Sequence, residues 1–193
     1  MGVAFGVALA LTATVLTRVG TDEKSIRLAL RVTARWSFLL FWLAYAGGAL
    51  ATLMPQAFAV LAGRGREFGL AFAAAHLVHI GLIVRLGQIL NKVPLRGWLL
   101  VFFAVAIFFT YLLALLSFGG LSQILGRGAW RAVMFIGMNY ILIAFGRDFV
   151  LHVTKTGVVN QDFSQLMNYA PFAALCLIAP LLRIAAAQRR RGM

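Results

Sequence analysis

Charged residues and cysteine are scarce in this sequence. The 193 residues include 18 Lys or Arg, 5 Asp or Glu and a single cysteine, Cys176. One cysteine cannot form an intrachain disulfide, a CxxC zinc site or the ligand set of an iron–sulfur cluster, so redox chemistry here needs another cofactor. Hydrophobic residues make up 62% of the chain, against about 45–50% in soluble domains, which excludes a water-soluble globule.

The motifs of nucleotide chemistry and hydrolysis are also missing. We find no P-loop, no dinucleotide fingerprint after a strand, no HExxH and no nucleophile elbow. The chain therefore cannot itself take hydride from a nicotinamide cofactor, and any electrons must come from quinol or another polypeptide. A net charge of +13 suits nucleic acid only on a soluble face, which a chain this apolar lacks. Anionic lipid headgroups and acidic protein partners are the expected counter-charges.

Six apolar runs separate the charge clusters, and they approach the roughly 17–25 residues that a helix needs to cross a bilayer. Runs such as VFFAVAIFFTYLLALL are apolar on all sides, as lipid-buried helices are. The fifth run covers only about 22 Å at 1.5 Å per residue, so we expect it to continue through Arg147 and Asp148. The sequence predicts an all-α bundle of six spans in one domain, with the third and fifth spans facing each other. The predicted spans are 2–17, 36–54, 68–84, 97–118, 132–153 and 163–182.

Basic residues are divided almost evenly between the two sets of span ends. One set carries eight and the other ten, so the positive-inside rule barely discriminates between the two orientations. The C-terminal QRRRGM is the densest basic cluster, and we therefore expect both termini in the cytoplasm. The eight are Arg64, Arg66, Arg127, Arg131, Arg183, Arg189, Arg190 and Arg191.

Three histidines, His76, His79 and His152, are the main candidates for chemistry. His76 and His79 are three residues apart on the third span, so they share one helix face. Burying such polar side chains in hydrocarbon is costly unless partners satisfy them. Three interpretations stay open: an interhelical hydrogen bond to Tyr, Asn or Ser, a non-haem metal pair of His76 and His79, and haem ligation.

Two segments carry a resemblance to a known family. GREFGLAFAAAHLVHIGLIVRL resembles the third helix of the ferric-reductase-like transmembrane family, and LGRGAWRAVMFIGMNYILIAFGRDFVLH resembles its basic loop, Trp and fifth helix. Within the family, the closest similarity is to the bacterial haem-binding membrane subunits that serve a periplasmic methionine sulfoxide reductase. The resemblance implies a bacterial inner membrane protein with b-type haem between histidines of the third and fifth helices. Electrons would then pass between the haem and a protein partner or quinol.

The fifth helix departs from the family pattern. When Trp130 is used as the anchor, the two fifth-helix histidine positions fall on Met134 and Arg147. Neither is histidine, although Met can ligate haem iron. This departure favours a haem-free relative, an accessory subunit that has kept the bundle within a larger membrane complex.

A second alignment keeps one haem. If His152 is matched to the outer histidine of the family, the inner position falls on Asn139. The resemblance then implies one b-type haem between His79 and His152, with His76 and Arg147 as further cofactor-binding residues and Arg147 close to a propionate. The corresponding function is a membrane electron-transfer subunit.

Charged residues near the span ends form a last set of candidates. Arg27, Arg31 and Arg35 repeat every four residues and form one stripe of a helix that leads into the second span. We expect this stripe to anchor to headgroups or to bind a propionate, an anionic substrate or a lipid phosphate. Adjacent helical residues point about 100° apart. We therefore expect Arg147 to face inward, towards a propionate or towards Asn, Tyr or a carbonyl, and Asp148 to reach the interface.

Overall fold

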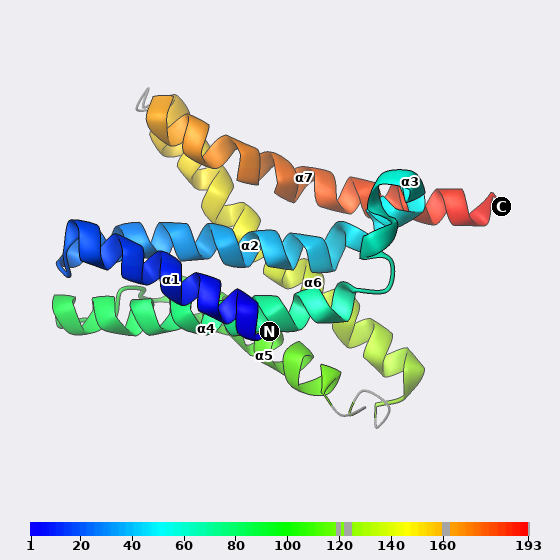
Figure 1. Cartoon of the computed structure of the whole chain (residues 1–193), viewed down its shortest axis with the longest axis horizontal. Helices are drawn as coiled ribbons and strands as arrows, with labels where there is room; N and C mark the ends of the chain where they lie inside the picture. Colours follow the sequence, from blue (N-terminus) through cyan, green and yellow to red (C-terminus); the bar gives the residue numbers. More distant parts are fainter. Residues whose placement is uncertain (119–120, 122–124, 160–162, 193) are drawn as a thin grey trace.

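The computed structural model describes residues 1–118, 121, 125–159 and 163–192, and these residues confirm the all-α prediction (Figure 1). Most of the described residues are helical, and none of them lies in a strand. The elements are α1 (Gly2–Val19), α2 (Glu23–Leu53), α3 (Pro55–Phe58), the 3-10 helix η1 (Ala59–Leu61), α4 (Gly65–Leu90), α5 (Trp98–Ser117), α6 (Gly126–Leu151), the π-helical η3 (His152–Val159) and α7 (Phe163–Arg191).

Six of these helices are long and apolar enough to cross a membrane, which makes the chain a multi-pass membrane protein. They are α1, α2, α4, α5, α6 and α7. The fifth candidate span covers Gly126–Lys155, because α6 runs on into η3. The predicted continuation of this span through Arg147 and Asp148 is therefore confirmed.

Helix α2 lies at the centre of the bundle, with its backbone packed against α1, α4 and α7. Half of the residues in its most apolar 18-residue stretch are buried inside the protein, a larger share than in any other candidate span. Helix α5 packs on α6 and α4 at the opposite side from α7. The arrangement leaves α1 and α5 as the spans with the least buried surface.

Helix α2 begins earlier than the second predicted span. The Asp22 carboxylate caps the helix by accepting a hydrogen bond from the backbone N–H of Ser25, at 3.0 Å. The 31 residues that follow span about 46 Å, more than the roughly 30 Å hydrocarbon core, so the helix extends into the headgroup region. Arg27, Arg31 and Arg35 therefore belong to the spanning helix itself and not to a separate interfacial segment.

Aromatic rings fill the centre of the bundle. Phe38 and Phe41 of α2 are fully buried, and Phe38 meets Phe149 of α6 edge to face at 5.0 Å. Helices α4 and α6 meet through Phe72 and Phe145, whose ring centroids are 6.1 Å apart. Each such pair contributes about 0.5–1.5 kcal/mol beyond its burial. The third and fifth spans, α4 and α6, thus face each other as predicted. They meet through side chains, which keep the two backbones apart.

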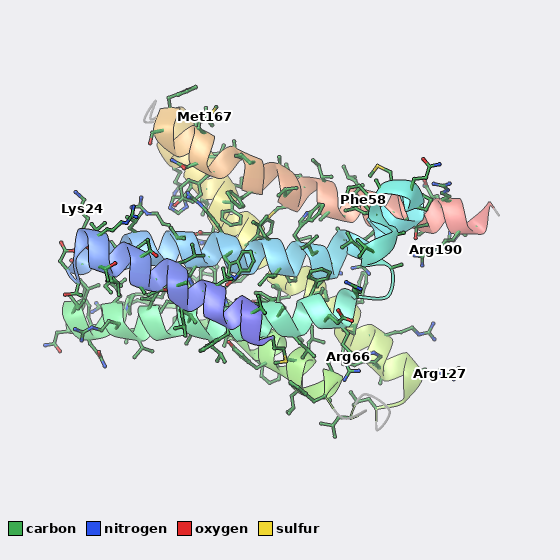
Figure 2. The ribbon with its side chains drawn as sticks, viewed as in Figure 1. Lys24, Phe58, Arg66, Arg127, Met167 and Arg190 are labelled. Atoms are coloured by element: carbon green, nitrogen blue, oxygen red, sulfur yellow. The ribbon has the colours of Figure 1, made fainter. Side chains whose placement is uncertain are left out.

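The two ends of the bundle differ in their basic residues. Figure 2 shows Arg66, Arg127 and Arg190 at one end, where α2 and α7 end and α4 and α6 begin, and Lys24 at the other. We call these the arginine end and the lysine end. Their separation matches the two sets of span ends expected from the sequence, because helices that alternate in direction bring every second connection to the same end.

Candidate functional site

His76 and His79 lie on one face of α4, as predicted. Their rings stack with centroids 5.2 Å apart. The Thr33 hydroxyl of α2 donates to the Ala29 carbonyl, and its oxygen lies 3.0 Å from His79 Nδ1. That oxygen therefore accepts from Nδ1–H, and Nε2 of the neutral ring carries the lone pair. His79 thus makes the interhelical hydrogen bond that the sequence left open, although to threonine. His76 Nδ1 is buried and has no hydrogen-bond partner among the described residues.

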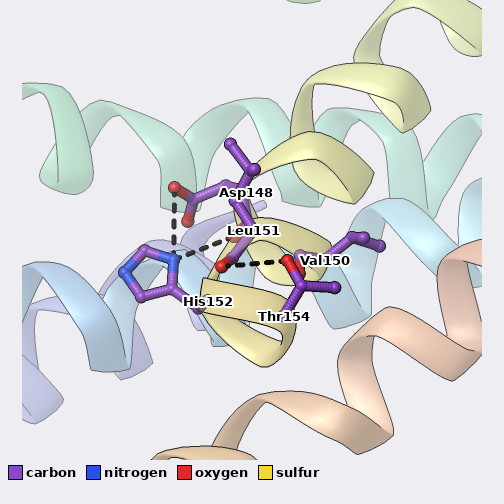
Figure 3. A network of polar contacts seen from close by, with 5 residues as sticks. All are labelled: Asp148, Val150, Leu151, His152 and Thr154. Atoms are coloured by element: carbon purple, nitrogen blue, oxygen red, sulfur yellow. Dashed lines mark hydrogen bonds and ion pairs between the residues drawn. The ribbon is translucent and has the colours of Figure 1, made fainter. Parts of the chain in front are cut away.

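His152 lies where α6 passes into η3, with 40% of its side chain exposed (Figure 3). Its Nδ1 is 2.8 Å from the Asp148 carbonyl and 3.7 Å from the Asp148 carboxylate. A carbonyl only accepts, so Nδ1 carries the hydrogen. The ring stacks on Tyr169 of α7 at 4.4 Å and 10°. These contacts hold His152 on α6 and against α7.

A continuous chain of ring contacts separates His79 from His152. Successive centroids along this chain are 5.2, 6.4, 6.0, 6.3 and 4.4 Å apart. A haem between two histidines needs their nitrogens on opposite sides of one iron, about 4 Å apart at metal–nitrogen distances of about 2 Å. Among the described ring contacts none joins the two imidazoles directly, and each is held by other groups, His79 by Thr33 and His152 by Tyr169, so this arrangement does not fit that haem. In order, the rings are His79, His76, Phe145, Phe149, Tyr169 and His152.

A metal pair of His76 and His79 also lacks further ligands. Within the part of the chain that the structure describes, no three His, Cys, Asp or Glu residues come together in a way that could hold a metal ion. Two imidazoles alone leave most of the coordination sphere of a transition metal to other groups. The structure therefore brings His76 and His79 together without completing a site around them.

Arg147 faces α5, not the histidines. Its guanidinium carbon lies 5.1 Å from the ring centroid of Trp98, 5.9 Å from Phe103 and 6.0 Å from Phe102. Aromatic faces attract a cation, so these rings supply the partner that we expected from Asn, Tyr or a carbonyl. Asp148 has 45% of its side chain exposed, and its position at the membrane interface stays a prediction.

The arginine stripe of α2 divides between two environments. Arg27 forms an exposed ion pair with Glu23 at 2.7 Å. Arg35, two turns on, places its guanidinium carbon 4.9 Å from the Tyr169 centroid and 5.5 Å from Phe172, both on α7. Its Nε is buried without a hydrogen-bond partner. Only the first part of the stripe is therefore free to act as a surface anchor.

A cavity of about 1060 Å³ lies between α2, α4, α5, α6 and α7 towards the arginine end, and sequence analysis did not predict it. It runs from buried rings in the interior, past the half-buried Arg183, to the exposed Arg66, Arg131 and Arg190 at its mouth. None of the described residues that line it is a histidine. Its apolar lining includes Phe41, Phe72, Trp130, Met134 and Met138, and its four cations are Arg66, Arg131, Arg183 and Arg190.

The arginines of the cavity contact neutral groups. The Arg183 guanidinium carbon lies 4.5 Å from the centroid of Tyr45, whose hydroxyl donates to Asn139 Oδ1 at 2.8 Å. Arg190 donates to the Thr52 hydroxyl at 2.7 Å. The ion pairs found among the described residues lie elsewhere, near the start of α2 and at the end of α6. The positive charge of the cavity is therefore not neutralised by a carboxylate there.

Comparison of the chain with protein-family models, curated proteins and solved structures gives no match. The ferric-reductase-like resemblance and the haem that it implies therefore stay predictions. The six-span helical bundle, the stacked histidine pair and the arginine-lined cavity are the features from which function has to be argued.

Proposed function

We propose that the chain is a haem-free accessory subunit of a larger membrane complex. The observation that carries this proposal is that His79 and His152 make no direct ring contact among the described residues and are linked only through a series of other rings that includes Phe145 and Phe149. Each histidine has a local partner instead, Thr33 for His79 and the Asp148 carbonyl for His152. Both rings then serve to hold helices together, as polar side chains commonly do inside membrane bundles.

We infer a protein partner from the catalytic and cofactor-binding groups that the chain lacks. It has no nucleotide-binding motif, and the described residues contain no group of metal-binding side chains. Met134, one of the two residues at the family's histidine positions, faces the cavity, and the other, Arg147, packs on α5. A bundle without its own reaction centre acts by holding, positioning or completing another protein. Lipid covers the remaining apolar surface.

For the location, we propose the bacterial inner membrane with the arginine end in the cytoplasm. Helix α7 continues to Arg191, so the three terminal arginines extend this end as one compact cationic cluster. Such clusters next to a span are retained on the cytoplasmic side. A phosphatase reporter fused after Met193 should be inactive and a cytoplasmic fluorescent reporter active; the opposite pair of results would reverse the orientation.

The haem question has a direct spectroscopic test. The protein is expressed with ample haem, extracted in mild detergent and examined by absorption spectroscopy and native mass spectrometry. We expect no Soret band, no reduced α/β bands and recovery of the chain together with another polypeptide. A stoichiometric haem spectrum that is lost in His79→Ala would overturn the proposal in favour of the electron-transfer subunit. Recovery only as an isolated monomer would overturn the accessory role.

A further inference from the structure

The cavity at the arginine end has the two properties of a site for an anionic amphiphile, an apolar interior and a cationic mouth. We propose that it binds a lipid with a phosphate headgroup, with the chain in the interior and the phosphate among Arg66, Arg131, Arg183 and Arg190. This inference rests on different residues from the haem-free proposal, which depends on the rings nearer the lysine end.

The interior of the cavity suits a hydrocarbon chain. Its volume of about 1060 Å³ is slightly larger than the roughly 300–1,000 Å³ typical of ligand pockets. The buried rings of Phe41 and Phe72 lie in its inner part, and Met134 and Met138 of α6 line one of its walls. Flexible methionine side chains adapt to ligands of irregular shape. A Cβ added at Gly48 would meet no atom within 4 Å, so the α2 wall is open there.

The mouth of the cavity suits a phosphate. All four of its cations are arginines, whose planar guanidinium groups bind phosphate oxygens in pairs and remain charged at any physiological pH. None of the described residues that line the cavity carries a carboxylate, because Glu23, Glu67 and Asp148 of the surrounding helices all lie outside the lining. A guanidinium has five N–H donors. The one hydrogen bond from Arg190 to Thr52 and the stacking of Arg183 on Tyr45 therefore leave donors for a ligand.

The shape of the site favours a lipid over the other anions that arginines bind. Inorganic phosphate would satisfy the mouth but leave the apolar interior empty. A haem has the required carboxylates, but no histidine lines the described part of the cavity. A phospholipid matches both parts, and the phosphates of a bilayer lie at the depth where spanning helices end.

The test measures binding to the full chain in a neutral detergent by native mass spectrometry. The probe is dioleoyl phosphatidic acid, compared with dioleoylglycerol, which has the same chains without the phosphate, and with inorganic phosphate. We expect phosphatidic acid to bind at least about tenfold more tightly than dioleoylglycerol, because charge-assisted hydrogen bonds to a phosphate are lost in the neutral lipid. Inorganic phosphate should not compete at millimolar concentration.

Matched variants locate the site. Arg131→Gln removes a cation of the mouth and should weaken phosphatidic acid binding about tenfold, whereas Arg127→Gln removes a neighbouring cation outside the cavity. Gly48→Leu fills the interior and should weaken both lipids, whereas Gly81→Leu adds the same side chain where α4 has open space outside the cavity. We expect both controls to bind within twofold of the original protein. If Arg131→Gln does not fold, Arg66→Gln replaces it.

Several results would overturn the lipid site. Equal affinity for phosphatidic acid and dioleoylglycerol would remove the role of the arginines, and competition by inorganic phosphate would point to an anion site without a lipid chain. Equal losses of phosphatidic acid affinity in Arg127→Gln and Arg131→Gln would indicate that surface charge alone attracts the lipid. A Soret band that Gly48→Leu abolishes would assign the cavity to haem. The accessory role fails separately, by recovery of an isolated monomer.

Discussion

Helices α4 and α6 enclose two regions of opposite character. Towards the lysine end, Phe145 and Phe149 of α6 fill the space with rings, and towards the arginine end Met134 and Met138 on the same face line a cavity. On α4, Gly69 lines the cavity without a side chain, whereas Phe72 and His76, further along the helix towards the lysine end, carry rings in contact with each other. The backbone geometry is helical throughout, so side-chain size decides which part of the interhelical space is filled.

The contrast is tested most strongly by truncating one residue from each region. Phe149→Ala should lower the free energy of unfolding by about 3–5 kcal/mol, because a ring exposed by only 1% leaves a cavity in close-packed surroundings. Met138→Ala should cost about 2 kcal/mol or less, because one side of Met138 already faces open space. Equilibrium unfolding in detergent measures both values. Equal losses would mean that the two regions are packed alike.

Adding a methyl group sharpens the comparison at the arginine end, where a closely packed glycine and an open one lie near the same cavity. A Cβ at Gly137 would lie 3.0 Å from Leu113 and Phe109 of α5, so Gly137→Ala should cost about 1–3 kcal/mol. A Cβ at Gly48 meets nothing within 4 Å, and Gly48→Ala should stabilise α2 by up to about 1 kcal/mol. Opposite signs in the same unfolding assay are the expected result. A loss of stability in Gly48→Ala would show that the cavity wall is not open.

The histidine pair offers a smaller test within the filled region. Thr33→Val keeps the shape of the side chain but removes the oxygen that accepts from His79, and should cost about 0.6–1.7 kcal/mol, as for other hydrogen bonds between membrane helices. A double-mutant cycle with His79→Phe isolates the pair. Additive effects of the two substitutions would contradict a direct hydrogen bond.

The smallest expected effect is at the exposed start of α2. Hydrogen bonds from the Ser25 hydroxyl and backbone N–H hold the pKa of Asp22 below its usual value. The ionised cap therefore stabilises the first turn above the unfolded-state pKa, and this contribution is lost as the pH falls through the lowered pKa. The protection of the Ser25 amide against hydrogen exchange, taken relative to the intrinsic exchange rate at each pH, should fall on acidification. Asp22→Ala should show low protection at every pH, whereas a change in protection with pH that persists in this variant would exclude Asp22 as its source.

Much of the fold could be predicted from local sequence. Hydropathy located all six candidate spans, and the shortness of the fifth run correctly required it to pass Arg147 and Asp148. Helix ends were less predictable, because α2 begins at Glu23 and carries arginines on turns that charge counting places outside the membrane. Long basic side chains extend from a helix end to the headgroups, so charge does not mark where a helix stops.

The candidate site was predicted only in part. The three-residue spacing of His76 and His79 places them on one face, which their stacked rings confirm. The spacing says nothing about helix rotation or about rings from other helices, and it therefore did not show that Phe145 of α6 packs against His76. The aromatic partners of Arg147 were missed because only hydrogen-bonding groups were considered as its partners. The cavity has no local signal, since its lining comes from five spans.

The position of α7 has a consequence for how the protein is made. A chain is synthesised from its N-terminus, so α2, α4, α5 and α6 enter the membrane before α7. Arg183 and Arg190 of α7 line the cavity, which is therefore completed only when the last span docks on α2 and α6. Until then the cavity lacks the wall that α7 provides, and a lipid bound there as proposed would be enclosed by the docking of the last span.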